Sequence, residues 1–245
     1  MKPTLFSFGP IHIYSYGTLV ALGVLVALGF LLYRARREGF PKTADVYDLI
    51  FVTVVSGFLG ARIFYVVQNI HLYSGHLLSI LAFWEGGLIY FGGSVGALIG
   101  LWIFAKVRRL SYLGILDFLL PAVALAHAFG RIGCFLNGCC YGTASDLPWA
   151  VSFPHLPHPV HPTQLYEAAF NLGLFWVLYA YYPKRRFTGQ ITCFYFLFYG
   201  AGRFILEFWR ADNPAWHLLT YNQWLSLILG GVFGLMLMVY ARRRA

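Results

Sequence analysis

The sequence predicts an all-α polytopic membrane protein with about seven transmembrane helices, its N-terminus external and its C-terminus cytoplasmic. Of its 245 residues, 59% are hydrophobic and only 11% are charged, whereas a soluble globular domain carries about 25% charged residues. The apolar residues form runs of membrane-spanning length, and most Lys and Arg residues flank alternate ends of those runs. We therefore expect one integral membrane domain over residues 1–245, with an external loop at about 137–162.

Each apolar run is about 20 residues long, which is the length that a helix needs to cross the hydrocarbon core. A helix is expected because it satisfies its backbone hydrogen bonds internally in lipid, and the alternating segments of a β-barrel are missing. The first run is followed by basic residues and is expected to be a retained span rather than a signal peptide. The runs cover residues 13–33, 47–68, 88–105, 113–135, 163–182, 188–209 and 221–240.

Lysine and arginine give the orientation, because cytoplasmic loops are enriched in both. With seven spans, 13 of the 18 basic residues fall on one side, and only Lys2 and Arg210 fall on the other. The net charge of +9 is thus explained by topology, and we expect no nucleic-acid partner. The clusters are Arg34, Arg36, Arg37 and Lys42, then Lys106, Arg108 and Arg109, then Lys184, Arg185 and Arg186, and finally Arg242, Arg243 and Arg244.

Three further arginines, Arg62, Arg131 and Arg203, lie inside predicted spans, each in the outer half. A charge within a membrane is costly and indicates a functional site by default, with a structural ion pair as the alternative. Few acidic residues are available to pair these cations, so we expect an anionic lipid phosphate, which a guanidinium can bind with two hydrogen bonds. Tyr199, Arg203 and Glu207 are spaced by four and share one helix face.

The segment from His127 to Gly142 combines glycines with polar residues and three cysteines. The cysteines at 134, 139 and 140 could bind metal, form a disulfide or fill space. Their spacing, and that of the histidines at 155, 158 and 161, fits no standard zinc site. We expect Cys139 and Cys140 to support the loop and to bind no metal, and Thr163 to cap the fifth span.

Aromatic and glycine residues gather near the outer ends of the first and third spans, namely Tyr16 in the first and Tyr90, Gly92 and Gly93 in the third. Such aromatics suit either a binding site or a membrane-interface belt. The glycines, with Gly96 and Gly100, also suit close packing of helices in lipid.

An ordered set of motifs covers nearly the whole chain and resembles the prolipoprotein diacylglyceryl transferases of the bacterial cytoplasmic membrane. Every motif occurs in the order in which the family has it, and the ordered set is specific. The motifs are FSFGP…YSYG (6–17), GARIFY (60–65), WEGGLIYFGG (84–93), GRIGCFLNGCCYG (130–142), HPTQLYE (161–167), YGAGRFILEFWR (199–210) and QWLSL (223–227).

The resemblance implies a transferase that moves the diacylglyceryl group of phosphatidylglycerol to the lipobox cysteine of a preprolipoprotein and releases glycerol phosphate. It implies membrane lipids as partners and neither a metal nor an organic cofactor. Arg131, Arg203, Glu207 and Tyr199 are the expected catalytic residues. The expected substrate-binding residues are Tyr16, Arg62, Tyr90, Gly92, Gly93, Asn137, Gly142, His161, Gln164 and Glu167.

The chain departs from the family pattern at three motif positions. Cys134 and Cys139 stand where the family commonly has Asn and Glu, and Phe91 stands where it often has His. The usual candidate base is therefore missing, and Glu207 or Tyr90 are the substitutes. Two alternatives stay open: a paralogue with another acceptor, and a non-enzymatic carrier or channel for an anion, although no internal repeat is seen.

Overall fold

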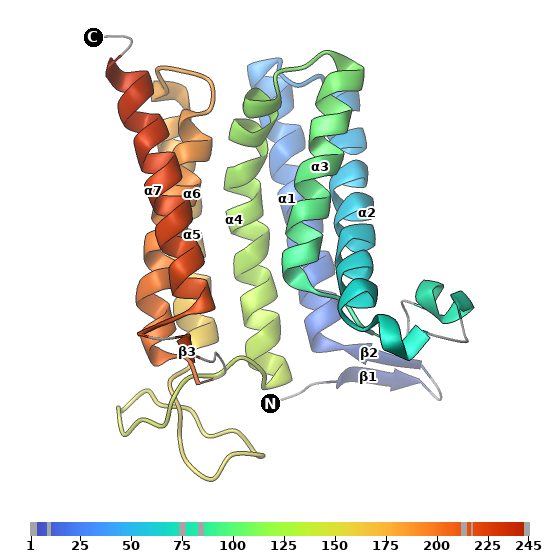
Figure 1. Cartoon of the computed structure of the whole chain (residues 1–245), viewed down its shortest axis with the longest axis vertical. Coiled ribbons are helices and arrows are strands. Elements are labelled where there is room, and N and C mark those ends of the chain that lie inside the picture. The colour runs from blue at the N-terminus through green and yellow to red at the C-terminus, as the bar shows by residue number, and fades with distance from the viewer. Residues whose placement is uncertain are drawn as a thin grey trace. The chain divides into compact units, whose positions relative to one another are not determined.

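The computed structural model describes residues 4–8, 11–73, 77–82, 86–211, 215–216 and 218–242. Seven long helices occur in this part of the chain, and each coincides with a predicted span to within a few residues (Figure 1). They are α1 (Ser15–Glu38), α2 (Thr43–Gln68), α3 (Tyr90–Arg108), α4 (Tyr112–Asn137), α5 (Thr163–Tyr181), α6 (Gln190–Leu206) and α7 (Tyr221–Arg242).

Six of these described helices are long and apolar enough to cross a membrane, α6 with its continuation to Trp209, and the chain is a multi-pass membrane protein. The exception is α5, whose buried residues include Gln164, Glu167 and Asn171. Their spacing places them on one face of the helix. The polar stripe that lowers the hydropathy of α5 is thus turned away from lipid and into the protein.

Short strands accompany the helices and were not expected from the sequence. Strand β1 (Thr4–Phe8) pairs antiparallel with β2 (Ile11–Tyr14), and β3 (Ala215–Trp216) pairs with β4 (Leu219–Thr220). The predicted start of the first span was therefore too early, because Ile13 and Tyr14 pair with Phe6 and Thr4 instead of continuing the helix. The remaining elements are the 3-10 helices η1 (Ile70–Tyr73), η2 (Leu77–Leu81), η4 (Tyr182–Lys184) and η5 (Glu207–Trp209).

The chain forms two compact units, one of residues 1–30 with 116–245 and one of residues 31–115. The second unit is built on α2 and α3, which touch through glycines. A Cβ atom added to Gly60 would lie 2.7 Å from the Cα of Gly96, and one added to Gly57 would lie 3.4 Å from the carbonyl oxygen of Gly93. Real side chains do not fit at the first of these distances. The predicted role of the glycines in close helix packing is confirmed.

The first unit contains α5, α6, α7 and most of α4, and a buried acid fixes its geometry. Asp117 of α4 accepts hydrogen bonds from the backbone amides of Gly189 (2.7 Å) and Thr192 (2.8 Å). These amides belong to the first turn of α6, where helical donors have no partner within the helix. Asp117 therefore caps α6 and sets its start against α4.

The basic clusters follow the predicted alternation within each unit. In the second unit, Arg108 at the end of α3 forms ion pairs with Asp45 (3.7 Å) and Asp48 at the start of α2. In the first unit, the ends of α5 and α7 lie beside the start of α6 (Figure 1), so the cluster at 184–186 shares an end with Arg242. Lys2, Arg243 and Arg244 lie outside the described residues, and the side of the membrane that each end faces stays a prediction.

Candidate active site

The site centres on Glu167, whose side chain is only 2% exposed. Helix α5 begins at Thr163, after Pro162, and Glu167 lies in its second turn. Thr163, Glu167 and Asn171 are all buried and follow one another at intervals of four residues. This spacing carries the carboxylate on the inward face of α5.

Arginines from three separate segments approach the carboxylate of Glu167. Nη2 of Arg131 in α4 lies 3.0 Å from Oε1, whereas Nη1 of Arg203 in α6 lies 3.7 Å from Oε2. Arg210, which follows η5, places Nη1 3.6 Å from Oε2. The structure thus brings together Arg131, Arg203 and Glu167, which the sequence had singled out, and adds Arg210, which the sequence analysis had assigned to the external surface.

A second carboxylate supports the cluster. Oε2 of Glu207 lies 3.1 Å from Nη2 of Arg203, so these two residues, which the sequence placed on one helix face, form an ion pair. Oε1 of Glu207 accepts hydrogen bonds from Thr220 Oγ1 (2.7 Å) and Asn222 Nδ2 (3.0 Å). Glu207 therefore links Arg203 to the start of α7, which suits a residue that orients the guanidinium.

His127 is a member of the cluster that the sequence analysis did not assign. Its Nε2 atom accepts a hydrogen bond from Nε of Arg131 (3.2 Å) and lies 3.6 Å from Oε1 of Glu167. Because an arginine donates and never accepts, Nδ1 of a neutral His127 carries the proton. The ring lies 5.7 Å from that of Tyr199, which stacks on Tyr195. The available signal was its position four residues before Arg131, on the same face of α4.

The charges of this cluster do not cancel. Among the described residues, three guanidinium groups face two carboxylates, which leaves one positive charge in excess when His127 is neutral. Nη1 of Arg203 is buried and has no hydrogen-bond partner among the described residues. A buried donor without a partner raises the free energy of the folded protein. A ligand that accepts its hydrogen bond removes this penalty. The arrangement is therefore suited to an anion.

The loop between α4 and α5 is fixed by backbone hydrogen bonds near Arg210. The backbone amide of Gly142 donates to the carbonyl oxygen of His161 (2.9 Å). The backbone amide of Thr143 donates to the carbonyl oxygen of Trp209 (2.8 Å). A Cβ atom at Gly142 would lie 2.7 Å from the Cβ of His161, so only glycine fits. Nδ1 of His161 contacts the hydroxyl of Tyr166 at 3.3 Å. Gly142 and His161 thus position the loop beside Arg210.

Two residues at the start of α5 form hydrogen bonds with the backbone of Cys139 and Cys140. Nε2 of Gln164 donates to the carbonyl oxygen of Cys139 (2.7 Å), and Oγ1 of Thr163 donates to that of Cys140 (3.0 Å). Thr163 is therefore not the N-cap that was predicted. Pro162 precedes the helix, and the Thr163 hydroxyl is directed at the loop.

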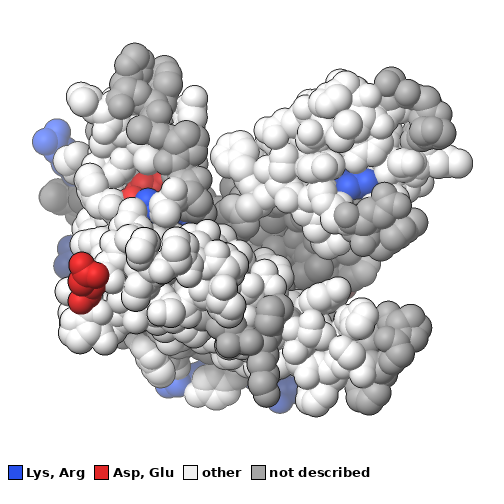
Figure 2. All heavy atoms as spheres, turned by 90° about the horizontal axis from the view of Figure 1, so that it is seen from below, with Lys and Arg blue, Asp and Glu red and all other residues white. Residues whose placement is uncertain are grey.

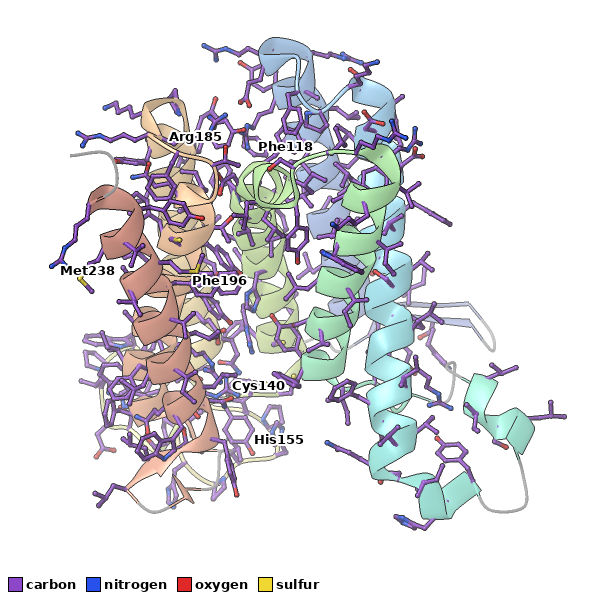
Figure 3. All side chains as sticks on the ribbon, turned by 45° about the horizontal axis from the view of Figure 1, so that its top comes forward. Phe118, Cys140, His155, Arg185, Phe196 and Met238 are labelled. Atoms are coloured by element: carbon purple, nitrogen blue, oxygen red, sulfur yellow. The ribbon has the colours of Figure 1, made fainter. Side chains whose placement is uncertain are left out.

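The three neighbouring cysteines are free thiols, and their Sγ atoms lie within 4.8 Å of one another. No histidine joins this group in the described part of the chain. Cys140 has a left-handed backbone with φ of 61°. It lies, with His155, at the end of the first unit opposite to Arg185 (Figure 3).

Two predicted residues of the first unit lie at its surface. Asn137 is the last residue of α4 and is exposed. Tyr16 is 45% exposed, and its Cα would lie 3.2 Å from a Cβ atom at Gly133. Seen from below, most side chains around this end carry no charge, and the charged atoms form small spots (Figure 2).

Arg62, Tyr90, Gly92 and Gly93 belong to the second unit. Arg62 donates hydrogen bonds to the carbonyl oxygens of Ser79 (2.8 Å), Ile80 (2.8 Å) and Gly86 (2.7 Å). These bonds anchor the connection after α2 through carbonyl groups, and no ion pair of Arg62 with an acidic residue is seen among the described residues. Binding of lipid by Arg62 stays a prediction. Gly92 packs on Gly60, while Tyr90 is 72% exposed at the start of α3.

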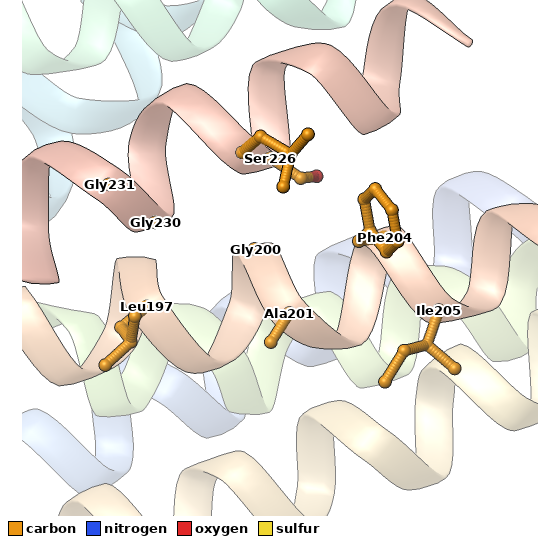
Figure 4. Close-up of a pocket in the computed structure, with 9 residues that line it drawn as sticks. Leu197, Gly200, Ala201, Phe204, Ile205, Ser226, Gly230 and Gly231 are labelled. Carbon is orange, nitrogen blue, oxygen red and sulfur yellow. The ribbon is translucent and has the colours of Figure 1, made fainter. Parts of the chain in front are cut away.

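An apolar groove of about 480 Å³ separates α6 from α7 in the first unit (Figure 4). No charged residue lines it, so it is not part of the arginine cluster. Glycines of α7 open it, because Gly230 and Gly231 have no atom within 4 Å of a Cβ position. The lining residues are Leu197, Gly200, Ala201, Phe204, Ile205, Ser226, Leu227, Gly230 and Gly231.

Fold and site define a multi-pass membrane protein with a buried arginine–carboxylate cluster near one end of its helices. The sequence profile of the family described as prolipoprotein diacylglyceryl transferase matches residues 3–240. The chain belongs to this family.

Relatives named phosphatidylglycerol–prolipoprotein diacylglyceryl transferase align with nearly the whole chain. The one from Clostridium tetani (strain Massachusetts / E88) is 35% identical over 243 residues, covering 95% of this chain and 96% of the relative. Those from Cupriavidus necator and Bordetella avium are each 37% identical, covering 99% of this chain and 93% and 96% of the relatives.

Proposed function

We propose that this chain transfers the diacylglyceryl group of phosphatidylglycerol to the lipobox cysteine thiol of preprolipoproteins, the first step of lipoprotein maturation. The names of the relatives support the reaction. The observation that carries it is the contact of Arg131, Arg203 and Arg210 with one buried carboxylate, because three guanidinium groups gathered at one place suit an anion.

In this reaction the cysteine sulfur attacks the carbon of the diacylglyceryl group that bears the phosphate ester. A carbon–sulfur bond forms, the carbon–oxygen bond breaks, and glycerol phosphate leaves with the electron pair. Negative charge grows on the phosphate as it departs. Guanidinium groups held in place beside the departing phosphate stabilise the transition state without reorganising, and their planar fork matches two phosphate oxygens.

The thiol must lose its proton to become a nucleophile. Glu167, Glu207 and His127 are the described members of the cluster that can take up a proton. Glu207 is committed on one oxygen to Thr220 and Asn222. Glu167 and His127 share the neighbourhood of Arg131, so a proton accepted by either one changes the charge next to the proposed phosphate contact.

The site requires placement at a membrane surface where both substrates meet. We infer the bacterial cytoplasmic membrane, with the N-terminus and the 138–162 loop external and the C-terminus cytoplasmic. Phosphatidylglycerol, a lipobox peptide and membrane lipids are the partners, and no nucleic acid, metal or organic cofactor takes part. The two compact units then act as a single membrane domain.

The deciding experiment is transfer by the full-length protein, purified in detergent, from radiolabelled phosphatidylglycerol to a lipobox peptide. A peptide whose cysteine is replaced by serine serves as the control substrate. We expect a thioether-linked lipid on the cysteine peptide alone, with glycerol phosphate released in equal amount. Release of glycerol phosphate without lipidated peptide would indicate another acceptor, and no release would refute the proposal.

A further inference from the structure

Three thiols converge directly beside the charged cluster. Cys134 lies at the end of α4 and is buried, whereas Cys139 and Cys140 are partly exposed in the loop that follows. The backbone amide of Cys139 donates to the carbonyl oxygen of Cys134 (3.1 Å), which folds the loop back on the helix. We propose that Cys134 and Cys140 form a reversible disulfide, so that this cluster is an oxidisable site at the edge of the active centre.

The electrostatic setting favours a thiolate over a bound cation. A hydrogen bond from the Cys134 thiol lowers the pKa of the Cys140 thiol, burial raises it, and the positive charges of Arg210 and Arg131 lower it further, so that the net pKa is below the usual value. The same two guanidinium groups oppose a metal ion. A reactive cysteine of this kind is partly exposed, has a stabilised thiolate and lies beside a second thiol that can resolve a mixed disulfide.

Geometry selects the pair of cysteines. A disulfide needs Cα atoms about 4.4–6.8 Å apart, whereas neighbours in sequence have Cα atoms about 3.8 Å apart. A bond between Cys139 and Cys140 is therefore strained. Sγ of Cys139 is directed at the carbonyl oxygen of Cys134, 3.7 Å away. Cys140 is thus the attacking thiolate, and Cys134 is the resolving thiol.

The reaction needs a small disulfide as the oxidant. The Cys140 thiolate attacks one sulfur of oxidised glutathione, forms a mixed disulfide and releases glutathione thiolate. Cys134 then attacks Sγ of Cys140, and its proton leaves with the second glutathione. Two protein thiols are oxidised to one disulfide, and one glutathione disulfide is reduced to two thiols.

Oxidation acts on the active centre through two connections. Cys134 lies three residues after Arg131 on α4, and Thr163 and Gln164 tie the cysteine loop to the helix that carries Glu167. The two sulfurs must close from at most 4.8 Å to about 2 Å. We expect this movement to shift the loop that carries Cys140, which Thr163 and Gln164 connect to α5, so oxidation should lower the transfer rate. The last statement rests on the proposed function, whereas the thiol chemistry does not.

The test is mass spectrometry of the purified full-length chain after incubation with oxidised glutathione. We expect the wild type to lose two hydrogens in the fragment that holds residues 134 and 140. Cys134→Ala should instead retain glutathione on Cys140, because the resolving thiol is gone, and Cys140→Ala should form neither product. Cys193→Ala is the matched control, because this buried cysteine of α6 lies outside the cluster, and it should behave as the wild type.

Several results would overturn the inference. They are four unmodified thiols in the oxidised wild type, a disulfide in Cys140→Ala, or one zinc or iron ion bound per chain on metal analysis. Oxidised wild type with unchanged transfer would overturn the link to the active centre. A reduced chain without any transfer would count against the proposed function, while the mass data would still decide the disulfide.

Discussion

Oε1 of Glu167 lies 3.0 Å from Nη2 of Arg131, although α4 and α5 are separated by the whole 138–162 loop. Arg203 and Arg210 contact the other oxygen, so one buried carboxylate holds three cations in place. The proposed function therefore links the stability of the first unit to the binding of phosphate through Glu167. On that proposal, a phosphate that enters the cluster replaces part of the charge that Glu167 supplies.

Glu167→Gln should lower the free energy of unfolding by about 3 kcal/mol or more, because buried guanidinium groups lose their counter-charge. Thermal unfolding in detergent measures this loss, and added phosphatidylglycerol should restore more stability to the variant than to the wild type. Asp48→Asn is the control, since its pair with Arg108 is exposed and costs less than about 1 kcal/mol. Equal stability of Glu167→Gln and the wild type would contradict the role of this residue.

Arg131→Ala and Arg203→Ala should each lower transfer at saturating phosphatidylglycerol by a factor of about 100 or more, equivalent to roughly 3 kcal/mol of transition-state stabilisation. Lysine at either position should restore only part of the transfer activity, because it keeps the charge but cannot donate two parallel hydrogen bonds as a guanidinium does. Lipid transfer to a lipobox peptide is the measurement. Near-normal turnover by correctly folded Arg203→Ala would refute the phosphate role.

Two further arginines serve as controls for this series. Arg36 is exposed near the end of α1, and its replacement by Ala should leave turnover unchanged. Arg62 donates to backbone carbonyl groups, so Arg62→Ala should lower stability more than it lowers the turnover of the folded fraction. A selective loss of turnover at Arg62 would instead support a lipid contact there.

Asp117→Ala should destabilise the protein by about 1–2 kcal/mol, because the first turn of α6 loses its cap. Thr192→Ala removes only one side-chain hydrogen bond to Asp117 (2.7 Å) and should cost less. Both values come from unfolding in detergent with increasing denaturant. A larger loss for Thr192→Ala than for Asp117→Ala would rule out the capping role.

Gly96→Ala should separate α2 from α3, because the added Cβ would lie 2.8 Å from the Cα of Gly60 and still closer to the carbonyl oxygen of Ser56. Gly29→Ala is the matched control in α1, where no atom lies within 4 Å of the added group. Alanine should stabilise that helix by up to about 1 kcal/mol. Thermal unfolding of the two variants should therefore shift in opposite directions.

Reporter fusions after Arg37, Arg109, Arg186 and Arg244 should all report the cytoplasm, because these positions follow the basic clusters. An alkaline phosphatase and a fluorescent protein fusion at each position give opposite signals and control for expression. An external location at any one of the four would break the seven-span topology.

The sequence by itself determined the number of long helices, their approximate ends and the distribution of basic residues, because span length and positive charge act locally along the chain. Arg203 and Glu207 were placed on one helix face for the same reason, since a spacing of four is local, and the structure shows that they form an ion pair. The β1–β2 pairing was missed, because a short hairpin before an apolar run leaves no strong local pattern.

Only the tertiary structure decided which charges share a site. Arg131, Glu167 and Arg210 come from three segments, and their meeting depends on how α4, α5 and α6 pack. Long-range packing also decided the hydrogen bonds that Asp117 of α4 accepts from the start of α6, and those that Arg62 donates to the connection after α2. Periodicity gives the face of a helix on which a residue lies, whereas the partner on that face is set by long-range packing and buried electrostatics.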